Sequence, residues 1–272
     1  MNPSTSIKTA VLDGYEISEK DTSFFKSKGY IVLPGVATKE EIQYFRPAIN
    51  NAVKRLNKEN RKMEERDTYG KAFLQTMNIW KDDQEVTKFT LSHKFGKIAA
   101  ALLGVDKVRL YHDQALYKEP GGGPTPWHQD QFYWPLDTMN TITMWMPLID
   151  LDESMGMLTF AEGSHKDGLV ENVAISDQSE KIYSDYVQEK NYKVYCPPRM
   201  KAGDATFHYG YTLHKAPGNN SASIREIMTI IYFADGAKVT KPVNVEQEND
   251  RNTWLESMEP GNLAASALNP LV

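Results

Sequence analysis

The first hundred residues show hydrophobic patterns of both helical and strand type. Residues 21–28 predict a short helix that Gly29 ends, and residues 30–33 form an apolar run typical of a strand. A longer helix is expected from Thr38 onward, because Thr38 and Glu41 have the spacing of a capping box. Its apolar stripe consists of Ile42, Phe45, Ile49, Val53 and Leu56. Pro47 falls inside this helix, and we expect a kink there.

A second helical pattern covers residues 83–103 and ends at Gly104, after a strand expected around residues 73–79. Both long helices should pack on the outside of a sheet, because each has one apolar face. The segment over residues 58–70 is highly charged. Such a run is usually a solvated loop or helix end rather than a partner site, so we assign it no function.

The pattern changes at residue 105, where short runs of β-branched and aromatic residues begin, separated by Gly, Pro and Asn. They predict strands over residues 108–118, 141–148, 158–161, 192–195, 204–209 and 226–233. Helices first and strands afterwards indicate an α+β fold. We find no internal repeat and no linker, so we expect residues 1–272 to form one domain.

The composition is that of an ordinary soluble globular protein, with 40% hydrophobic and 25% charged residues. A formal net charge of -5, without a concentrated Lys/Arg face, argues against nucleic acid as a partner. No apolar run approaches the length of a membrane span, so we expect no membrane partner. The only cysteine, Cys196, cannot form an intramolecular disulfide, which favours a reducing, cytoplasmic location.

Candidate chemistry concentrates in residues 127–135, which read WHQDQFYWP. His128 and Asp130 are two positions apart, and in an extended strand such residues point to the same face. An imidazole and a carboxylate are two of the three ligands in the arrangement of two histidines and one carboxylate that holds non-haem Fe(II) and leaves positions open. A short polar pair of this kind is by itself more often a surface loop, so the hypothesis requires another histidine.

His214 and Arg225 supply what such a site requires. His214 lies 86 residues after His128, and Arg225 follows 11 residues later at the start of a strand-like run. The planar guanidinium can hold a carboxylate through two parallel hydrogen bonds, which suits the distal carboxylate of a 2-oxo acid that chelates iron. His208 is an alternative ligand six residues before His214, but no arginine follows it at the same distance.

The order His128, Asp130, His214 and Arg225 resembles the Fe(II)- and 2-oxoglutarate-dependent oxygenases of the phytanoyl-CoA dioxygenase family. The resemblance extends over roughly residues 20–235. Further matches are Trp127, residues 143–166, Gly203, Asp204, Asn220 and Ser221. The resemblance implies a double-stranded β-helix, a cupin-like jelly-roll barrel braced by N-terminal helices. The expected parts are an extended arm over residues 1–17, helical support with the first strands over 18–104, a barrel core over 105–235 and a C-terminal tail over 236–272.

The resemblance also implies a reaction. Fe(II) bound by His128, Asp130 and His214 would use 2-oxoglutarate and O2 as cosubstrates to hydroxylate a C–H bond of a small organic metabolite, with release of succinate and CO2. The related halogenases have a small residue where Asp130 stands, so hydroxylation is expected rather than halogenation. The alternatives are desaturation, epoxidation or ring closure at the same site, or a non-catalytic barrel that binds a metal or another ligand.

Other cosubstrate contacts are expected from the strands on either side of the metal motif. Gln114 lies on the preceding strand with a parity that faces the barrel interior, and Thr143 and Trp145 occupy the strand that follows. The family often has a hydroxyl residue two positions after the distal histidine, whereas this chain has Ala216. One hydrogen bond to 2-oxoglutarate is then missing or comes from another residue, for example Tyr117 or Thr143.

Phe132 and Trp134 share the strand parity of Asp130, so they are expected to wall the substrate space while Tyr133 faces away, unless all three are simply core aromatics. Such a wall suits an apolar, aromatic or quaternary-ammonium substrate. We see no cluster of basic residues for the phosphates of CoA. The polar insertion over residues 171–191 is a candidate cover for the mouth of the site.

Overall fold

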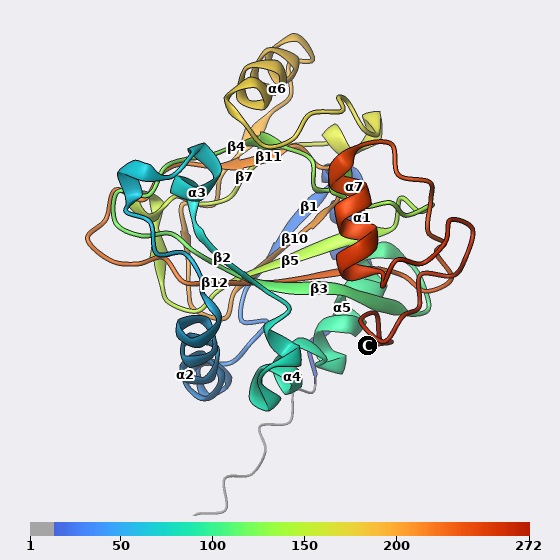
Figure 1. The fold of residues 1–272 in the computed structure, drawn as a ribbon, viewed down its shortest axis with the longest axis horizontal. Helices are drawn as coiled ribbons and strands as arrows, with labels where there is room; N and C mark the ends of the chain where they lie inside the picture. Colours follow the sequence, from blue (N-terminus) through green and yellow to red (C-terminus); the bar gives the residue numbers. More distant parts are fainter. Residues whose placement is uncertain (1–13) are drawn as a thin grey trace, which may run out of the picture.

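Two antiparallel sheets face each other in the computed structural model, which describes residues 14–272 (Figure 1). The larger sheet has the strand order β1 (Tyr30–Leu33), β10 (Ala205–Tyr209), β5 (Thr141–Pro147), β12 (Ile227–Ala234), β3 (Val108–Tyr117) and β2 (Leu74–Met77). The smaller sheet has the order β4 (Thr125–His128), β11 (His214–Ala216), β7 (Thr159–Ala161) and β8 (Val194–Tyr195). A separate two-stranded pair consists of β6 (Leu151–Asp152) and β9 (Arg199–Met200).

This architecture confirms the α+β class and the jelly-roll barrel that the resemblance implies. Each of the six strands predicted after residue 105 overlaps an observed strand, and so does the strand predicted over residues 30–33. The four strands that the pattern did not predict, β4, β6, β9 and β11, have four residues or fewer, which is too short for a clear alternation. The arm predicted over residues 1–17 falls mostly outside the described residues.

Four helices share one hydrophobic core with the outer face of the larger sheet. They are α1 (Glu19–Lys28), α2 (Lys39–Leu56), α4 (Gln84–Thr90) and α5 (His93–Leu103). The predicted capping box of α2 is present, because the Thr38 hydroxyl accepts from the Glu41 backbone N–H and the Glu41 carboxylate accepts from that of Thr38. The helix runs on through Pro47, and its apolar stripe faces the sheet. The predicted bracing by N-terminal helices is therefore confirmed.

The single helix predicted over residues 83–103 is wrong, because the chain forms α4 and α5 with a break at Leu91 and Ser92. Ser92 is extended, with φ -64° and ψ 120°, and begins α5 as its N-cap. The break lets Phe89 and Phe95 meet edge to face, with ring centroids 5.1 Å apart and both rings fully buried. Tertiary packing of the two rings thus overrides the continuous helical period.

The remaining helical segments are η1 (Met63–Glu65), α3 (Thr68–Ala72), η2 (Ile79–Lys81), η3 (Asp130–Tyr133), η4 (Glu153–Met155), η5 (Ser164–Asp167), α6 (Asp177–Glu189) and α7 (Val245–Trp254). The insertion over residues 171–191 is partly helical, as expected, but its helix α6 packs against β4 through Tyr183 and Val187, which share a cluster with Trp127. This helix therefore covers the smaller sheet rather than the open end of the barrel (Figure 1), whereas Ile175 of the same insertion lines the cavity inside the barrel.

Two expectations drawn from composition can be compared with the structure. Within residues 14–272, no helix combines the length and the apolar character that a membrane span requires. Cys196 is exposed and its thiol is free, in agreement with the expected lack of an intramolecular disulfide.

A buried ion pair joins α2 to α5. Lys94 Nζ lies 2.8 Å from one carboxylate oxygen of Glu41, and both side chains are about 5% exposed. We expect Lys94→Met to lower the free energy of unfolding by about 3 kcal/mol, because the Glu41 carboxylate would stay buried without its counter-charge. Urea unfolding measures the difference.

The double variant Glu41→Gln/Lys94→Met should recover most of that loss, because it removes both charges. Lys88→Met is the matched control, since it breaks only the exposed pair of Lys88 with Glu85 and should scarcely change the stability. Equal losses in the single and double variants would contradict this account.

Candidate metal centre and adjoining cavity

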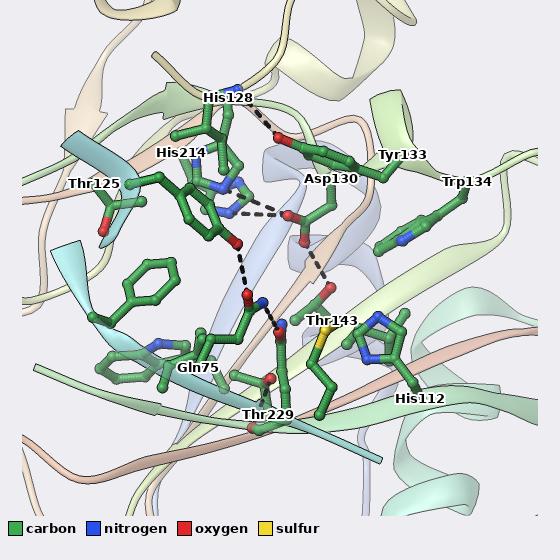
Figure 2. A pocket seen from close by; sticks show the side chains of 18 of the residues that line it. Gln75, His112, Thr125, His128, Asp130, Tyr133, Trp134, Thr143, His214 and Thr229 are labelled. Carbon is green, nitrogen blue, oxygen red and sulfur yellow. Dashed lines mark hydrogen bonds and ion pairs between the residues drawn. The ribbon is translucent and has the colours of Figure 1, made fainter. Parts of the chain in front are cut away.

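Three potential metal ligands meet at the junction of the two sheets (Figure 2). His128 ends β4 and His214 begins β11, and the register of these strands places the two residues directly opposite each other. Asp130 follows one extended residue later, at the start of η3. One donor atom from each of the three residues lies within 4.8 Å of the others. The three side chains therefore converge on one point, as expected.

Backbone carbonyls orient both imidazoles. Nδ1 of His128 lies 2.8 Å from the carbonyl oxygen of Pro126, and Nδ1 of His214 lies 2.9 Å from that of Thr212. Because a carbonyl only accepts, each Nδ1 carries the proton and each Nε2 presents a lone pair. The two Nε2 atoms lie 3.5 and 3.6 Å from the same oxygen of Asp130. Neutral rings in this tautomer are the form that binds a metal ion.

The two carboxylate oxygens of Asp130 have different surroundings. Oδ1 faces the Nε2 atoms of His128 and His214, whereas Oδ2 accepts a 2.8 Å hydrogen bond from the Thr143 hydroxyl and lies 3.3 Å from Nε2 of His208. Burial acts to raise the pKa of Asp130, whereas the imidazoles around it, His214 first, lower it well below its usual range whenever they carry a proton on Nε2. One oxygen is therefore left for a metal while the other fixes the orientation of the carboxylate.

Burial and its two imidazole neighbours, His128 and His208, hold the pKa of His214 well below its ordinary value, which keeps the ring neutral. His208, the alternative ligand, is only 1% exposed and faces Oδ2 rather than the side of Asp130 on which His128 and His214 converge. It is not part of the three-residue cluster. Thr143, expected near the cosubstrate, lines the cavity, and its hydroxyl donates to Asp130.

A cavity of about 330 Å³ opens beside the three side chains, and Arg225 lines it. The Arg225 side chain is 2% exposed and its guanidinium carbon lies 5.5 Å from the centre of the Trp145 ring. Nη1 donates to the carbonyl of Gly156, whereas Nε has no partner and the residue takes part in no ion pair within the described part of the chain. Burial lowers the pKa of Arg225 to about 9. A buried guanidinium without a counter-charge suits a carboxylate ligand.

Lys118 lies beside Arg225 and holds the adjacent loops together. It is fully buried, and its Nζ donates to the carbonyls of Gly123 and Pro217. Burial, with the nearby Arg225 charge, lowers the pKa of Lys118 to about 6. Thr125, 3.4 Å from this Nζ, also lines the cavity. It pairs with Ala216 across the strands, so it places a hydroxyl close to where the expected one is missing.

The expected pocket residues fall into two groups. Gln114, Trp145 and Trp134 line the cavity, whereas their contacts with cosubstrate or substrate stay predictions. Phe132 does not line it, whereas Tyr133 does, so the parity prediction is wrong for these two residues. The reason is local, because the strand ends before Asp130 and the chain turns into the short helix η3, where alternation no longer applies.

Several cavity residues come from segments to which we assigned no function. Tyr69 belongs to the charged segment over residues 58–70, and Phe73 and Gln75 follow it. Helix α7, from the tail, contributes Glu246, Asn249, Asp250, Thr253 and Trp254. Neither segment has a hydrophobic period or a recognisable motif, so only the fold reveals their position.

Facing antiparallel sheets with a His-Asp-His cluster at their junction define a cupin-like oxygenase of the non-haem iron class. The family model for phytanoyl-CoA dioxygenase (PhyH) matches residues 25–227, which is most of the chain. The chain therefore belongs to the phytanoyl-CoA dioxygenase family, and it is an enzyme that depends on Fe(II) and 2-oxoglutarate.

Individual relatives agree with this class. The phytanoyl-CoA dioxygenase domain-containing protein 1 of Danio rerio is 23% identical, over 89% of this chain and 96% of that protein. A methylphosphonate hydroxylase of Gimesia maris is 31% identical over about half of each chain, 51% in both cases. The solved structure of the alpha ketoglutarate dependent carbocyclase SnoK, from nogalamycin biosynthesis, has a TM-score of 0.78 and 25% identity, covering 94% of this chain and 96% of that one.

The Thr143 hydrogen bond to Asp130 can be tested by Thr143→Val. We expect this variant to bind Fe(II) about tenfold more weakly under anaerobic titration, because the carboxylate loses the donor that orients it. Thr229→Val is the matched control, since Thr229 lines the same cavity but donates to the Gln114 carbonyl. Equal Fe(II) affinity in both variants would mean that Thr143 does not orient the ligand.

Proposed function

We propose that His128, Asp130 and His214 hold the iron of this enzyme and that Arg225 binds the distal carboxylate of 2-oxoglutarate. The reaction is the hydroxylation of a C–H bond in a small organic metabolite. The observation that carries this proposal is a single cavity that has the three-residue cluster on its wall and a buried, unpaired guanidinium beside it. When bound, iron and 2-oxoglutarate supply the oxidising chemistry, in which O2 gives one oxygen atom to the substrate and one to succinate, with loss of CO2.

The chain contributes three donors and leaves the other side of the metal position to the cavity. Because Thr143 and His208 hold Oδ2 of Asp130, only Oδ1 is free to bind a metal ion. The carboxylate would therefore take up one coordination position. Open positions on the cavity side are what cosubstrate and oxygen require. The presence of this carboxylate also supports hydroxylation over halogenation.

The cavity wall positions the cosubstrate and excludes water. Arg225 offers its N–H groups to a carboxylate in surroundings from which water is largely removed, where charge-assisted hydrogen bonds are strongest. The Trp145 ring flanks the guanidinium, and Leu116 and Leu158 give the wall its apolar part. These residues fix the orientation of 2-oxoglutarate without taking part in bond making.

Ring closure is a second candidate outcome, supported by the similarity to a structure that is named a carbocyclase. The product distinguishes the two reactions, because hydroxylation adds one oxygen atom and ring closure removes two hydrogen atoms. Mass spectrometry of a converted substrate therefore decides between them.

We also propose that residues 1–272 act as one domain and that the enzyme is cytoplasmic. The free, exposed thiol of Cys196 supports a reducing compartment. Fractionation of cells that produce the protein, with detection of the intact chain, tests the location.

Removal of any one ligand should abolish turnover. We expect His128→Ala, Asp130→Ala and His214→Ala to lose substrate-dependent release of succinate from 2-oxoglutarate, because each removes a metal donor. His93→Ala is the control, since His93 is an exposed histidine at the start of α5. Unchanged turnover in the three variants would refute the ligand assignment. Absence of a visible charge-transfer band on anaerobic addition of Fe(II) and 2-oxoglutarate would support a non-catalytic barrel.

Arg225→Ala should raise the KM for 2-oxoglutarate about tenfold or more, because a charge-assisted hydrogen bond contributes about 1.5–3 kcal/mol. The kcat at saturating 2-oxoglutarate should change less, since the guanidinium holds the cosubstrate away from the reacting atoms. Arg109→Ala is the control, because Arg109 pairs with Asp235 outside the cavity. An unaltered KM in Arg225→Ala would remove this residue from the site.

A further inference from the structure

The cavity extends well beyond the position of Arg225. On β3, the residues His112, Gln114 and Leu116 line it in alternation, and Lys118 forms the backbone bridge to Arg225. Lys118 lies six positions after His112 along extended backbone, which corresponds to roughly 20 Å. Figure 2 shows His112 on the opposite side of the pocket from Thr125. The end at His112 is therefore separate from the end where 2-oxoglutarate binds.

Helix α7 brings two carboxylates to this end. Glu246 and Asp250 are four residues apart, so they lie on the same face of the helix, and both line the cavity. Asp250 accepts a 2.8 Å hydrogen bond from the Tyr111 hydroxyl. Neither acid forms an ion pair within residues 14–272, and Arg225 is the only lysine or arginine among the described residues that line the cavity. The end of the wall at helix α7 is thus acidic, and no lysine or arginine of the described chain lines that end.

Aromatic rings line the cavity together with the two carboxylates. Trp254, one turn after Asp250, stacks at a tilt on His112 with ring centroids 5.2 Å apart, and Tyr69 and Tyr133 also line the cavity. Burial raises the pKa of the Tyr69 phenol, and the negative charges of Asp130, Asp250 and Glu246 raise it further. That ring therefore lies in the field of all three acids. Aromatic faces beside carboxylates attract organic cations.

His112 gives an independent sign that a ligand binds here. Its side chain lines the cavity, the residue is 4% exposed, and Nδ1 has no hydrogen-bond partner among the described residues. Burial lowers the pKa of His112 to about 4, so the ring is neutral. A neutral imidazole keeps one acceptor nitrogen, and no hydrogen bond within the described residues occupies it, so it can accept a hydrogen bond from a bound ammonium group.

We propose that this end of the cavity, formed by Glu246, Asp250, Trp254 and His112, binds an ammonium group of the substrate. The proposal rests on the proposed function and adds the class of substrate to it. An amine or quaternary ammonium compound fits this wall, whereas acyl-CoA thioesters and phosphonates carry negative charge that the two carboxylates would repel. A metal ion is not the better occupant, because no third donor joins these two acids in a metal-sized cluster within the described chain.

The electrostatics of Asp250 agree with a missing cation. Burial raises the pKa of Asp250 to about 7, and the neighbouring Glu246 charge raises it further, against the Tyr111 and Trp254 hydrogen bonds. A bound ammonium would supply the counter-charge that the protein does not provide.

The test compares three probes of one shape and different charge: 2-phenylethylammonium, 2-phenylethanol and phenylacetate. Each is titrated by calorimetry, without oxygen, into enzyme loaded with Fe(II) and saturating 2-oxoglutarate, which keeps phenylacetate away from Arg225. We expect the ammonium to bind about tenfold more tightly than the alcohol, from cation–π and charged hydrogen-bond contacts, and phenylacetate to bind most weakly.

Glu246→Gln and Asp250→Asn should each remove most of the preference for the ammonium. Glu248→Gln is the matched control, because this acid belongs to the same helix but pairs with Arg251 and does not line the cavity. The Glu246 carboxylate makes no hydrogen bond to the part of the chain that the structure describes. Glu246→Gln therefore carries the test if Asp250→Asn fails to fold. The proposal is overturned if the ammonium does not bind, or if the alcohol or phenylacetate binds as tightly as the ammonium. It is also overturned if the variants keep the wild-type preference for the ammonium.

The same samples separate this proposal from the one on which it rests. If wild-type enzyme shows the charge-transfer band and releases succinate on exposure to O2, but does not prefer the ammonium probe, the proposed function stands and the proposed substrate class is refuted. If the enzyme shows no charge-transfer band and releases no succinate, the proposed function itself is refuted, whatever the probes show.

Discussion

The antiparallel pairing of β11 with β4 determines the position of both histidines in the site. It places two imidazoles from distant parts of the chain opposite each other, with ring centroids 4.0 Å apart. In both cases the carbonyl two residues earlier holds Nδ1, so the same local geometry orients His128 and His214. A slip of one residue would turn one ring to the other face of the sheet and dismantle the cluster. Asp130 then ties this sheet to the larger one through Thr143 of β5 and His208 of β10.

Much of this site could be predicted from the sequence, because few residue types can bind a metal ion or a carboxylate. Two histidines, one carboxylate and an arginine in this order leave little choice of metal or cosubstrate, and the structure brings the first three together and places the arginine on the same cavity. The fold was predictable for a similar reason. Strand runs and a capped amphipathic helix are local signals, and β1, β12 and α2 follow them closely.

What could not be predicted depends on contacts between distant segments. Tyr133 lines the cavity in place of Phe132 because the chain turns into η3. No pattern in the sequence predicts that turn. Helix α7 comes from a polar tail, and it is held by Asn244 and Gln247, whose side-chain amides donate to the Phe132 carbonyl. Such hydrogen bonds use a backbone atom that every residue has, so the sequence carries no sign of the partner.

Helix α7 follows residue 227, where the match to the family model ends, and it is not part of either sheet of the barrel. Helix α7 contributes five residues to the cavity wall, but none to the three-residue cluster. Selection can alter the charge or shape of this helix while the iron chemistry is inherited intact. Enzymes of this type can thus diverge toward unrelated metabolites through a few substitutions in one helix.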